Sequence, residues 1–123
     1  MRLALSPLAL SLSLALAGCG GADNAGTDGG TQTRTQRIAA LTGDVAAGQL
    51  VYENNGCSGC HGATGTGTSS GKSLTATLKN DPRADVLDTL LNGVPNTAMG
   101  SYASLEDQQL ADLYAYMKAT FGK

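Results

Sequence analysis

Two cysteines and the only histidine of the chain stand together at Cys57, Cys60 and His61, with Ser58 and Gly59 between the thiols. On one turn of a helix, residues three apart point the same way. Both sulfurs can therefore bond two vinyl groups along one edge of a porphyrin, and the next residue brings an imidazole beneath the ring, where it can bind the iron. Because C-x-x-C-H is the attachment signature of c-type haem, the run predicts one covalently bound haem c and a role in handling electrons.

The second axial ligand of the iron cannot be another imidazole of this chain, because the chain has one histidine. Met117 is in helical phase with Leu113 and Phe121, which favours packing in the core. Met99 lies in a glycine-rich loop without an apolar stripe, and His/Met ligation is usual for electron transfer. We therefore predict His61 and Met99 as the metal ligands. The alternative is that Met99 packs on the haem edge beside an open sixth site.

The first eighteen residues are predicted to be a signal peptide. An apolar run from residue 3 to residue 17 follows one arginine and is too short to span a bilayer comfortably. The run ends in Leu-Ala-Gly before Cys19, which resembles the lipobox of bacterial lipoproteins. The resemblance implies cleavage before Cys19 and lipid attachment to that residue, and two or more acyl chains anchor a protein stably. The alternative is an ordinary signal peptide followed by a coincidental cysteine.

Lipidation would place the mature protein on the periplasmic side of a bacterial membrane. Gly20, rather than aspartate, follows the cysteine, which by the same resemblance favours the outer membrane. This interpretation also accounts for every cysteine, because Cys19 takes lipid while Cys57 and Cys60 take haem.

Composition divides the rest of the chain at about residue 41. Residues 19–41 are predicted to be the lipidated cysteine and a flexible linker, since they are mainly Gly, Ala, Thr, Asp and Gln and show almost no periodicity. Residues 42–123 form the predicted domain, which has no tryptophan and needs the apolar surface of a haem to complete its core. The chain has a net charge of −2, which excludes nucleic acid as a partner because binding requires a basic face.

Apolar residues at helical spacing predict an all-α domain of about three to four helices around one haem, with no strand. The first helix is expected to begin at Asp44, a good N-cap residue. Val45, Gly48, Val51 and Tyr52 fall on one of its faces.

Two further helices follow the haem-attachment run. One is expected to start at Asp81-Pro82 and to end at Gly93, with Val86, Leu87, Leu90 and Leu91 as its apolar residues. The last is expected to start from a capping box at residues 104–107 and to run to Phe121. Residues 62–71 and 94–101 are predicted to be loops.

From Asp44 to Thr120 the chain resembles the class I monohaem cytochromes c. The resemblance rests on four pieces in order: Gly48 and Tyr52, the run Cys57–His61, the loop 92–99 ending in Met99, and Leu113 with Tyr116 in the terminal helix. It implies a small helical fold, one haem c and His/Met ligation. It also implies that Leu74 packs against the porphyrin.

Two positions depart from the pattern of that family. Gly100 follows Met99 where the family commonly has proline, which implies a less rigid loop and a weaker or exchangeable iron–sulfur bond. Lys72 stands in Gly71-Lys72-Ser73-Leu74 where the family has a proline whose carbonyl accepts the N–H of the proximal imidazole. The carbonyl of Lys72 could serve in the same way.

The sequence therefore predicts a membrane-tethered electron carrier, not an enzyme, that exchanges single electrons with unidentified redox proteins. The alternative is a haem enzyme or gas-binding sensor with an open or labile sixth coordination site, which would need polar distal groups. Thiol–disulfide exchange by the two cysteines would need a βαβ scaffold. Zinc binding would need a fourth ligand that the chain does not suggest.

Overall fold

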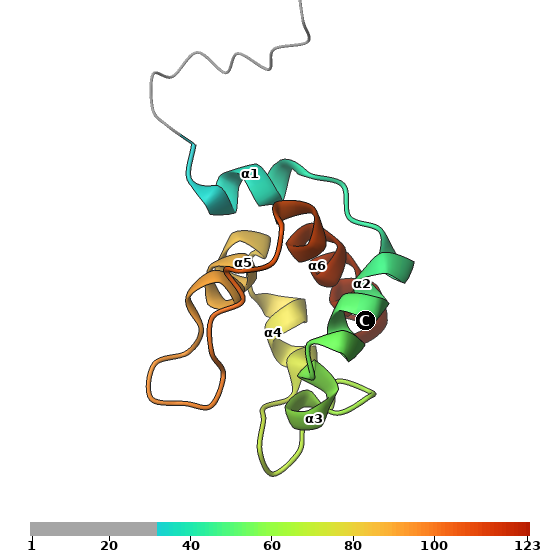
Figure 1. Cartoon of the computed structure of the whole chain (residues 1–123). Coiled ribbons are helices and arrows are strands. Elements are labelled where there is room, and N and C mark those ends of the chain that lie inside the picture. Colours follow the sequence, from blue (N-terminus) through green and yellow to red (C-terminus); the bar gives the residue numbers. More distant parts are fainter. Residues whose placement is uncertain (1–31) are drawn as a thin grey trace, which may run out of the picture. The chain divides into compact units, whose positions relative to one another are not determined.

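The computed structural model describes residues 32–123, which form six helices joined by loops (Figure 1). The helices are α1 (Arg34–Ala40), α2 (Val45–Asn54), α3 (Cys57–His61), α4 (Leu74–Asn80), α5 (Arg83–Asn92) and α6 (Asp107–Phe121). Within these residues the only pairing of β type is one isolated bridge between Thr68 and Gly71, so the all-α prediction is confirmed. The predicted signal peptide, Cys19 and the start of the linker lie outside the described residues.

Helix α1 corrects the predicted boundary between linker and domain. Residues 34–40 are helical rather than part of a flexible linker, and a capping box between Thr33 and Gln36 begins the helix. Ile38 is fully buried, and the Thr35 hydroxyl hydrogen-bonds Asp88 on α5. A helix of seven residues is not stable alone, so its contacts with α5 and α6 hold it in place.

Helices α2 and α6 cross in close contact at Gly48. A Cβ built at Gly48 would lie 1.9 Å from the carbonyl oxygen of Asp112 on α6, so a side chain does not fit between these backbones. Next to this crossing, the rings of Tyr52, Tyr116 and Phe121 pack against one another, with ring centroids 5.5 to 5.6 Å apart. This cluster joins α2 to α6.

The beginning of α2 is tied to α6 through a buried carboxylate. Asp44 caps α2 as predicted, and its backbone N–H donates to Oδ1 of Asp112 at 2.8 Å. The predicted apolar face is confirmed for Gly48 and its buried neighbours, whereas Val45 is 46% exposed because it lies at the solvent side of the first turn.

Helix α4 is missing from the sequence-based prediction, and the other helix starts shift slightly. Helix α5 begins at Arg83, after an N-cap at Pro82, and its four predicted apolar residues are all buried. Gly93 ends α5 with φ of 72°, a conformation that glycine adopts easily. Helix α6 begins with a capping box of Glu106 and Gln109, two residues beyond the predicted box.

None of the described helices is both long enough and apolar enough to cross a bilayer.

Candidate functional site

Helix α3, about one and a half turns long, carries the predicted haem-attachment residues. It starts after Gly56, whose φ of 70° turns the chain sharply from α2 into α3. Cys57 is 8% exposed, and Cys60 and His61 are partly buried. Neither thiol is in a disulfide. The structure thus places both sulfurs and the imidazole on one short helix.

The orientation of His61 is set by the backbone of Lys72. Nδ1 of His61 lies 2.7 Å from the carbonyl oxygen of Lys72. A carbonyl oxygen can only accept, so Nδ1 carries the proton and donates it. In the neutral imidazole, Nε2 is then the nitrogen with a free lone pair, the form in which histidine binds a metal. The hydrogen bond implied by the family resemblance is present although lysine replaces proline.

The loop after α3 brings Lys72 to this position by folding back on the attachment helix. Thr68 donates its hydroxyl proton to the carbonyl of Cys60 at 2.7 Å. A Cβ at Gly71 would lie 2.5 Å from the same carbonyl oxygen, so the chain passes there only because residue 71 is glycine. Leu74 follows at the start of α4 and is partly buried against the core.

Two adjoining cavities of about 240 and 230 Å³ lie beside α3. Their shared lining is Cys57, His61, Lys72, Val94, Met99 and Tyr102. Leu74 borders the larger cavity, and Cys60 borders the smaller one. Both are concave and mainly apolar, as expected for a cofactor site.

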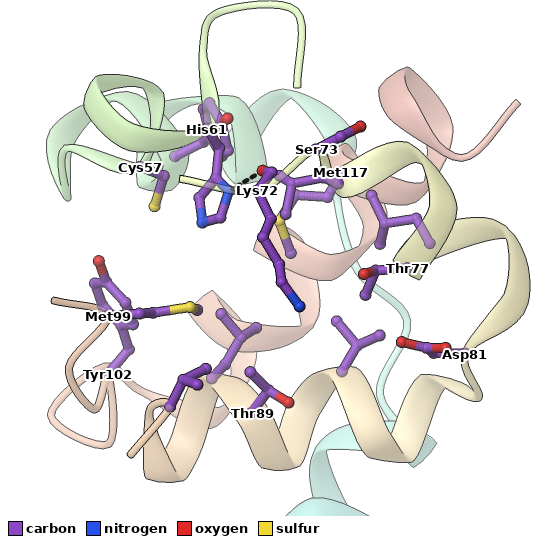
Figure 2. Close-up of a pocket in the computed structure, with 16 residues that line it drawn as sticks. Cys57, His61, Lys72, Ser73, Thr77, Asp81, Thr89, Met99, Tyr102 and Met117 are labelled. Atoms are coloured by element: carbon purple, nitrogen blue, oxygen red, sulfur yellow. Dashed lines mark hydrogen bonds between the residues drawn. The ribbon is translucent and has the colours of Figure 1, made fainter. Parts of the chain in front are cut away.

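The two predicted metal ligands enter the cavity from opposite sides. In Figure 2 the imidazole of His61 points into the space from α3, and the sulfur of Met99 points into it from the facing loop. The loop is closed by a hydrogen bond from the N–H of Val94 to the carbonyl of Met99, at 2.9 Å. Met117 is 4% exposed and belongs to the core, although it also borders the larger cavity.

Burial governs the acid–base behaviour of the groups around the cavity. Burial, with smaller contributions from Cys57 and Tyr116, raises the pKa of Tyr52 to about 12. Burial also raises the pKa of Cys57 and that of Tyr102, which both line the two cavities. The Tyr52 hydroxyl donates to the carbonyl of Gly62 at 2.8 Å, which fixes the exit of the chain from α3.

Several lining residues were not among the predicted site residues. Tyr102, Val94 and the α4 residue Thr77 face the cavity, and so does the side chain of Lys72 (Figure 2). Tyr102 could have been found from its place three residues after Met99 in an irregular loop. Thr77 could not, because α4 itself was not predicted.

The cavity fits a haem better than it fits a zinc ion or a thiol–disulfide exchange site. Two thiols lie at its edge, an imidazole with Nε2 available points inward, and the walls are mainly apolar. For zinc, residues 32–123 contain no group of three or more His, Cys, Asp or Glu side chains placed to hold a metal ion. For thiol–disulfide exchange, the described part of the chain has no βαβ unit around the two cysteines.

Comparison with known proteins agrees with this geometry. A family model described as cytochrome c oxidase, cbb3-type, subunit III matches residues 43–117, more than half of the chain. The cytochrome c-555 of Methylococcus capsulatus (strain ATCC 33009 / NCIMB 11132 / Bath) is 32% identical over 104 residues, which cover 72% of this chain and 83% of that protein. The chain is a class I monohaem cytochrome c. Its cofactor is one covalently bound haem c with its iron.

Solved structures of cytochromes c share the fold. The cytochrome c6 of the diatom Phaeodactylum tricornutum is 27% identical with a TM-score of 0.51, over 63% of this chain and 93% of that one. The cytochrome cL of Hyphomicrobium denitrificans is 29% identical with a TM-score of 0.52, over 60% of this chain. This cytochrome c spans only 45% of that longer protein.

Proposed function

We propose that this cytochrome c is a membrane-tethered electron carrier whose iron is held by His61 and Met99. The observation that carries the proposal is the entry of these two side chains into one cavity from opposite sides (Figure 2). When both axial positions of a haem are filled, substrate has no site on the metal. The bound haem supplies one-electron chemistry, because its iron alternates between Fe(II) and Fe(III).

The protein's contribution is to hold the ligands and exclude water. The hydrogen bond from His61 to the Lys72 carbonyl fixes the orientation of the imidazole ring. Leu74 and the core side chains of α5 keep the surroundings apolar, which tunes the reduction potential of a buried redox centre. Cys57 and Cys60 are the residues proposed to form the two thioether bonds.

Partner proteins are proposed to dock where the smaller cavity opens. That cavity is bordered by Gly56, Cys60, Val94 and Ala98, and Val94 is 37% exposed. Small and apolar side chains let another protein approach the cofactor edge closely. The donor and acceptor are proposed to be redox proteins at the same membrane.

The function is tested by carbon monoxide, which binds ferrous haem only at an open axial position. A carrier with His61 and Met99 on the iron leaves the ferrous spectrum unchanged under carbon monoxide. A rapid, saturable shift of the ferrous Soret band in the wild type would instead support a gas sensor or haem enzyme, and would overturn the carrier proposal.

The membrane tether is proposed from Cys19 and is tested separately. We expect the wild type to pellet with membranes and to enter the detergent phase of a two-phase partition. Cys19→Ser should move the protein to the soluble fraction with an unchanged haem spectrum. Equal partition of wild type and variant would contradict the lipid anchor without affecting the electron-carrier proposal.

A further inference from the structure

Helix α1 precedes the part of the chain that matches the cytochrome c family model, which begins at residue 43. It nevertheless packs against α5 and α6 within the domain. In Figure 1 it lies beside the segment that returns from the α5–α6 loop to the start of α6. An added helix that contacts this segment can influence the loop that carries Met99.

The contact is made by the guanidinium group of Arg34. Its Nη1 donates to the carbonyl oxygen of Ala103 at 2.6 Å, and its Nη2 donates to the carbonyl oxygen of Leu105 at 2.6 Å. Its Nε donates to Oδ1 of Asp107 at 2.7 Å. Three hydrogen bonds from one planar group fix the geometry of residues 103–107 more firmly than a single point charge could.

Residues 103–107 connect directly to the Met99 loop. Between Met99 and the first carbonyl held by Arg34 lie only residues 100–102. A Cβ at Gly100 would meet nothing within 4 Å, so this position has no side-chain contact, although its backbone passes close to Gly93. The N–H of Tyr102 donates to the carbonyl of Leu90 at 2.8 Å, and the Ser101 hydroxyl donates to the carbonyl of Leu91, so two hydrogen bonds attach this segment to α5. The loop is thus held by α5 on one side and by Arg34 on the other.

We propose that Arg34 is a positioning residue that keeps the Met99 loop closed over the cavity. The inference rests on the proposed function, in which Met99 is the sixth ligand. Without the guanidinium, the carbonyls of Ala103 and Leu105 lose their partners, and the hydrogen bonds to α5 alone hold the segment after Met99. An external ligand then competes more easily for the position of the Met99 sulfur.

Two residues of the same helix provide matched controls. Arg37 has the same side chain, but its Nε lies 3.7 Å from Oδ2 of Asp107, and none of its hydrogen bonds reaches the loop. Thr35 is buried and bonds Asp88 on α5, so its removal loosens α1 without freeing residues 103–107. Effects of general destabilisation should appear in Thr35→Ala, whereas effects on the loop should appear only at Arg34.

The experiment is a titration of the ferric, full-length holoprotein with imidazole, followed by loss of the sulfur-to-iron charge-transfer band. We expect Arg34→Ala to bind imidazole about tenfold more tightly than wild type, a change that corresponds to about 1.4 kcal/mol. Thr35→Ala and Arg37→Ala should stay within about twofold of wild type. If Arg34→Ala does not accumulate, Arg34→Lys can be used. Its imidazole affinity should lie between that of wild type and the tenfold increase expected for Arg34→Ala, because lysine keeps the positive charge but lacks the planar set of N–H donors of a guanidinium group.

Equal imidazole affinities for Arg34→Ala and Thr35→Ala would overturn the proposal, because a general loss of stability would then explain both.

Amide hydrogen exchange supplies a readout that does not depend on the iron ligand. Exchange at Val94 and Tyr102 should be faster in Arg34→Ala than in Thr35→Ala, and unchanged protection there would overturn the proposal as well. If the wild type lacks the charge-transfer band, the Met99 assignment fails and hydrogen exchange alone decides the role of Arg34.

Discussion

Replacing Gly48 with alanine should destabilise the domain, although the same substitution usually stabilises a helix. Alanine has the higher helix propensity by about 1 kcal/mol. At Gly48, however, the new Cβ would lie 1.9 Å from the carbonyl oxygen of Asp112 and 2.7 Å from Cβ of Tyr116. Ordinary contact begins at 3.4 Å, so α2 and α6 must separate by about 1.5 Å, the difference between 3.4 and 1.9 Å.

A separation of this size weakens the whole helix crossing. Overpacking typically costs about 1–3 kcal/mol, and a gap of about 1 Å removes up to half of the dispersion attraction between the facing atoms. We therefore expect Gly48→Ala to lower the free energy of unfolding by about 3 kcal/mol, a shift in Tm of roughly 15 °C.

The assay is thermal and urea unfolding of the holoprotein, followed by far-UV circular dichroism. Gly59→Ala is the matched control, because Gly59 is also helical and its Cβ would meet nothing within 4 Å. The control should be neutral or slightly more stable than wild type. A Gly48→Ala protein as stable as the Gly59→Ala protein would refute the close contact of α2 and α6 at Gly48.

Three further predictions concern the core and the cofactor. Burial raises the pKa of Tyr52 to about 12, so the protonated Tyr52 hydroxyl stabilises the fold fully below pH 10, and this stabilisation is lost as pH rises to 12. Tyr52→Phe should therefore reduce the fall of the free energy of urea unfolding over that window by at most about 1.4 kcal/mol per pH unit. Parallel pH curves for wild type and Tyr52→Phe would contradict this. Asp112→Ala should cost about 1 kcal/mol in urea unfolding, because it removes the hydrogen bond that the Asp44 N–H donates at the start of α2. Asp112→Asn keeps an acceptor and should cost less than half as much, and equal losses would count against the hydrogen bond. The double variant Cys57→Ala, Cys60→Ala should lack a cooperative calorimetric transition, since an empty cavity of 240 Å³ costs on the order of 5 kcal/mol; a native-like transition would show that the fold does not need the haem.

The attachment helix and the helix crossing were predictable because each depends on few residues with a strict geometric requirement. Cys57, Cys60 and His61 were predicted to lie together on one helix so that they could meet a porphyrin edge, and the structure has them on α3. Gly48 was predicted to lie on the inner face of the first helix, and it lies there because no other residue fits against Asp112. The apolar stripe of α5 was equally visible, since four residues repeat at helical spacing.

The short helices were not predictable, because periodicity needs more than two turns to show. Helix α1 has one fully buried aliphatic residue, Ile38, and its position depends on hydrogen bonds of Arg34 to residues about 70 positions away. Helix α4 has one buried residue, Leu78, and its last turn is capped by the distant Lys118 side chain, which donates to the Leu78 carbonyl. Contacts of this range are set by the tertiary fold and leave no local pattern.

Electrostatic roles were missed for the same reason. Arg34 and Asp112 look like ordinary surface charges in the sequence. In the structure, Arg34 ties the segment after the Met99 loop to α1, and the buried Asp112 accepts the N–H of Asp44, the N-cap residue of α2. Their importance depends on which backbone groups happen to be left without partners, and that is known only once the helices are placed.

The identity of the sixth iron ligand is the most direct test of how this cytochrome c works. The measurement is the near-infrared spectrum of the ferric protein for wild type, Met99→Ala and Met117→Leu. We expect a sulfur-to-iron charge-transfer band in wild type and in Met117→Leu, and its loss in Met99→Ala. A band that survives in Met99→Ala and disappears in Met117→Leu would contradict ligation by Met99 and assign the ligand to the core methionine.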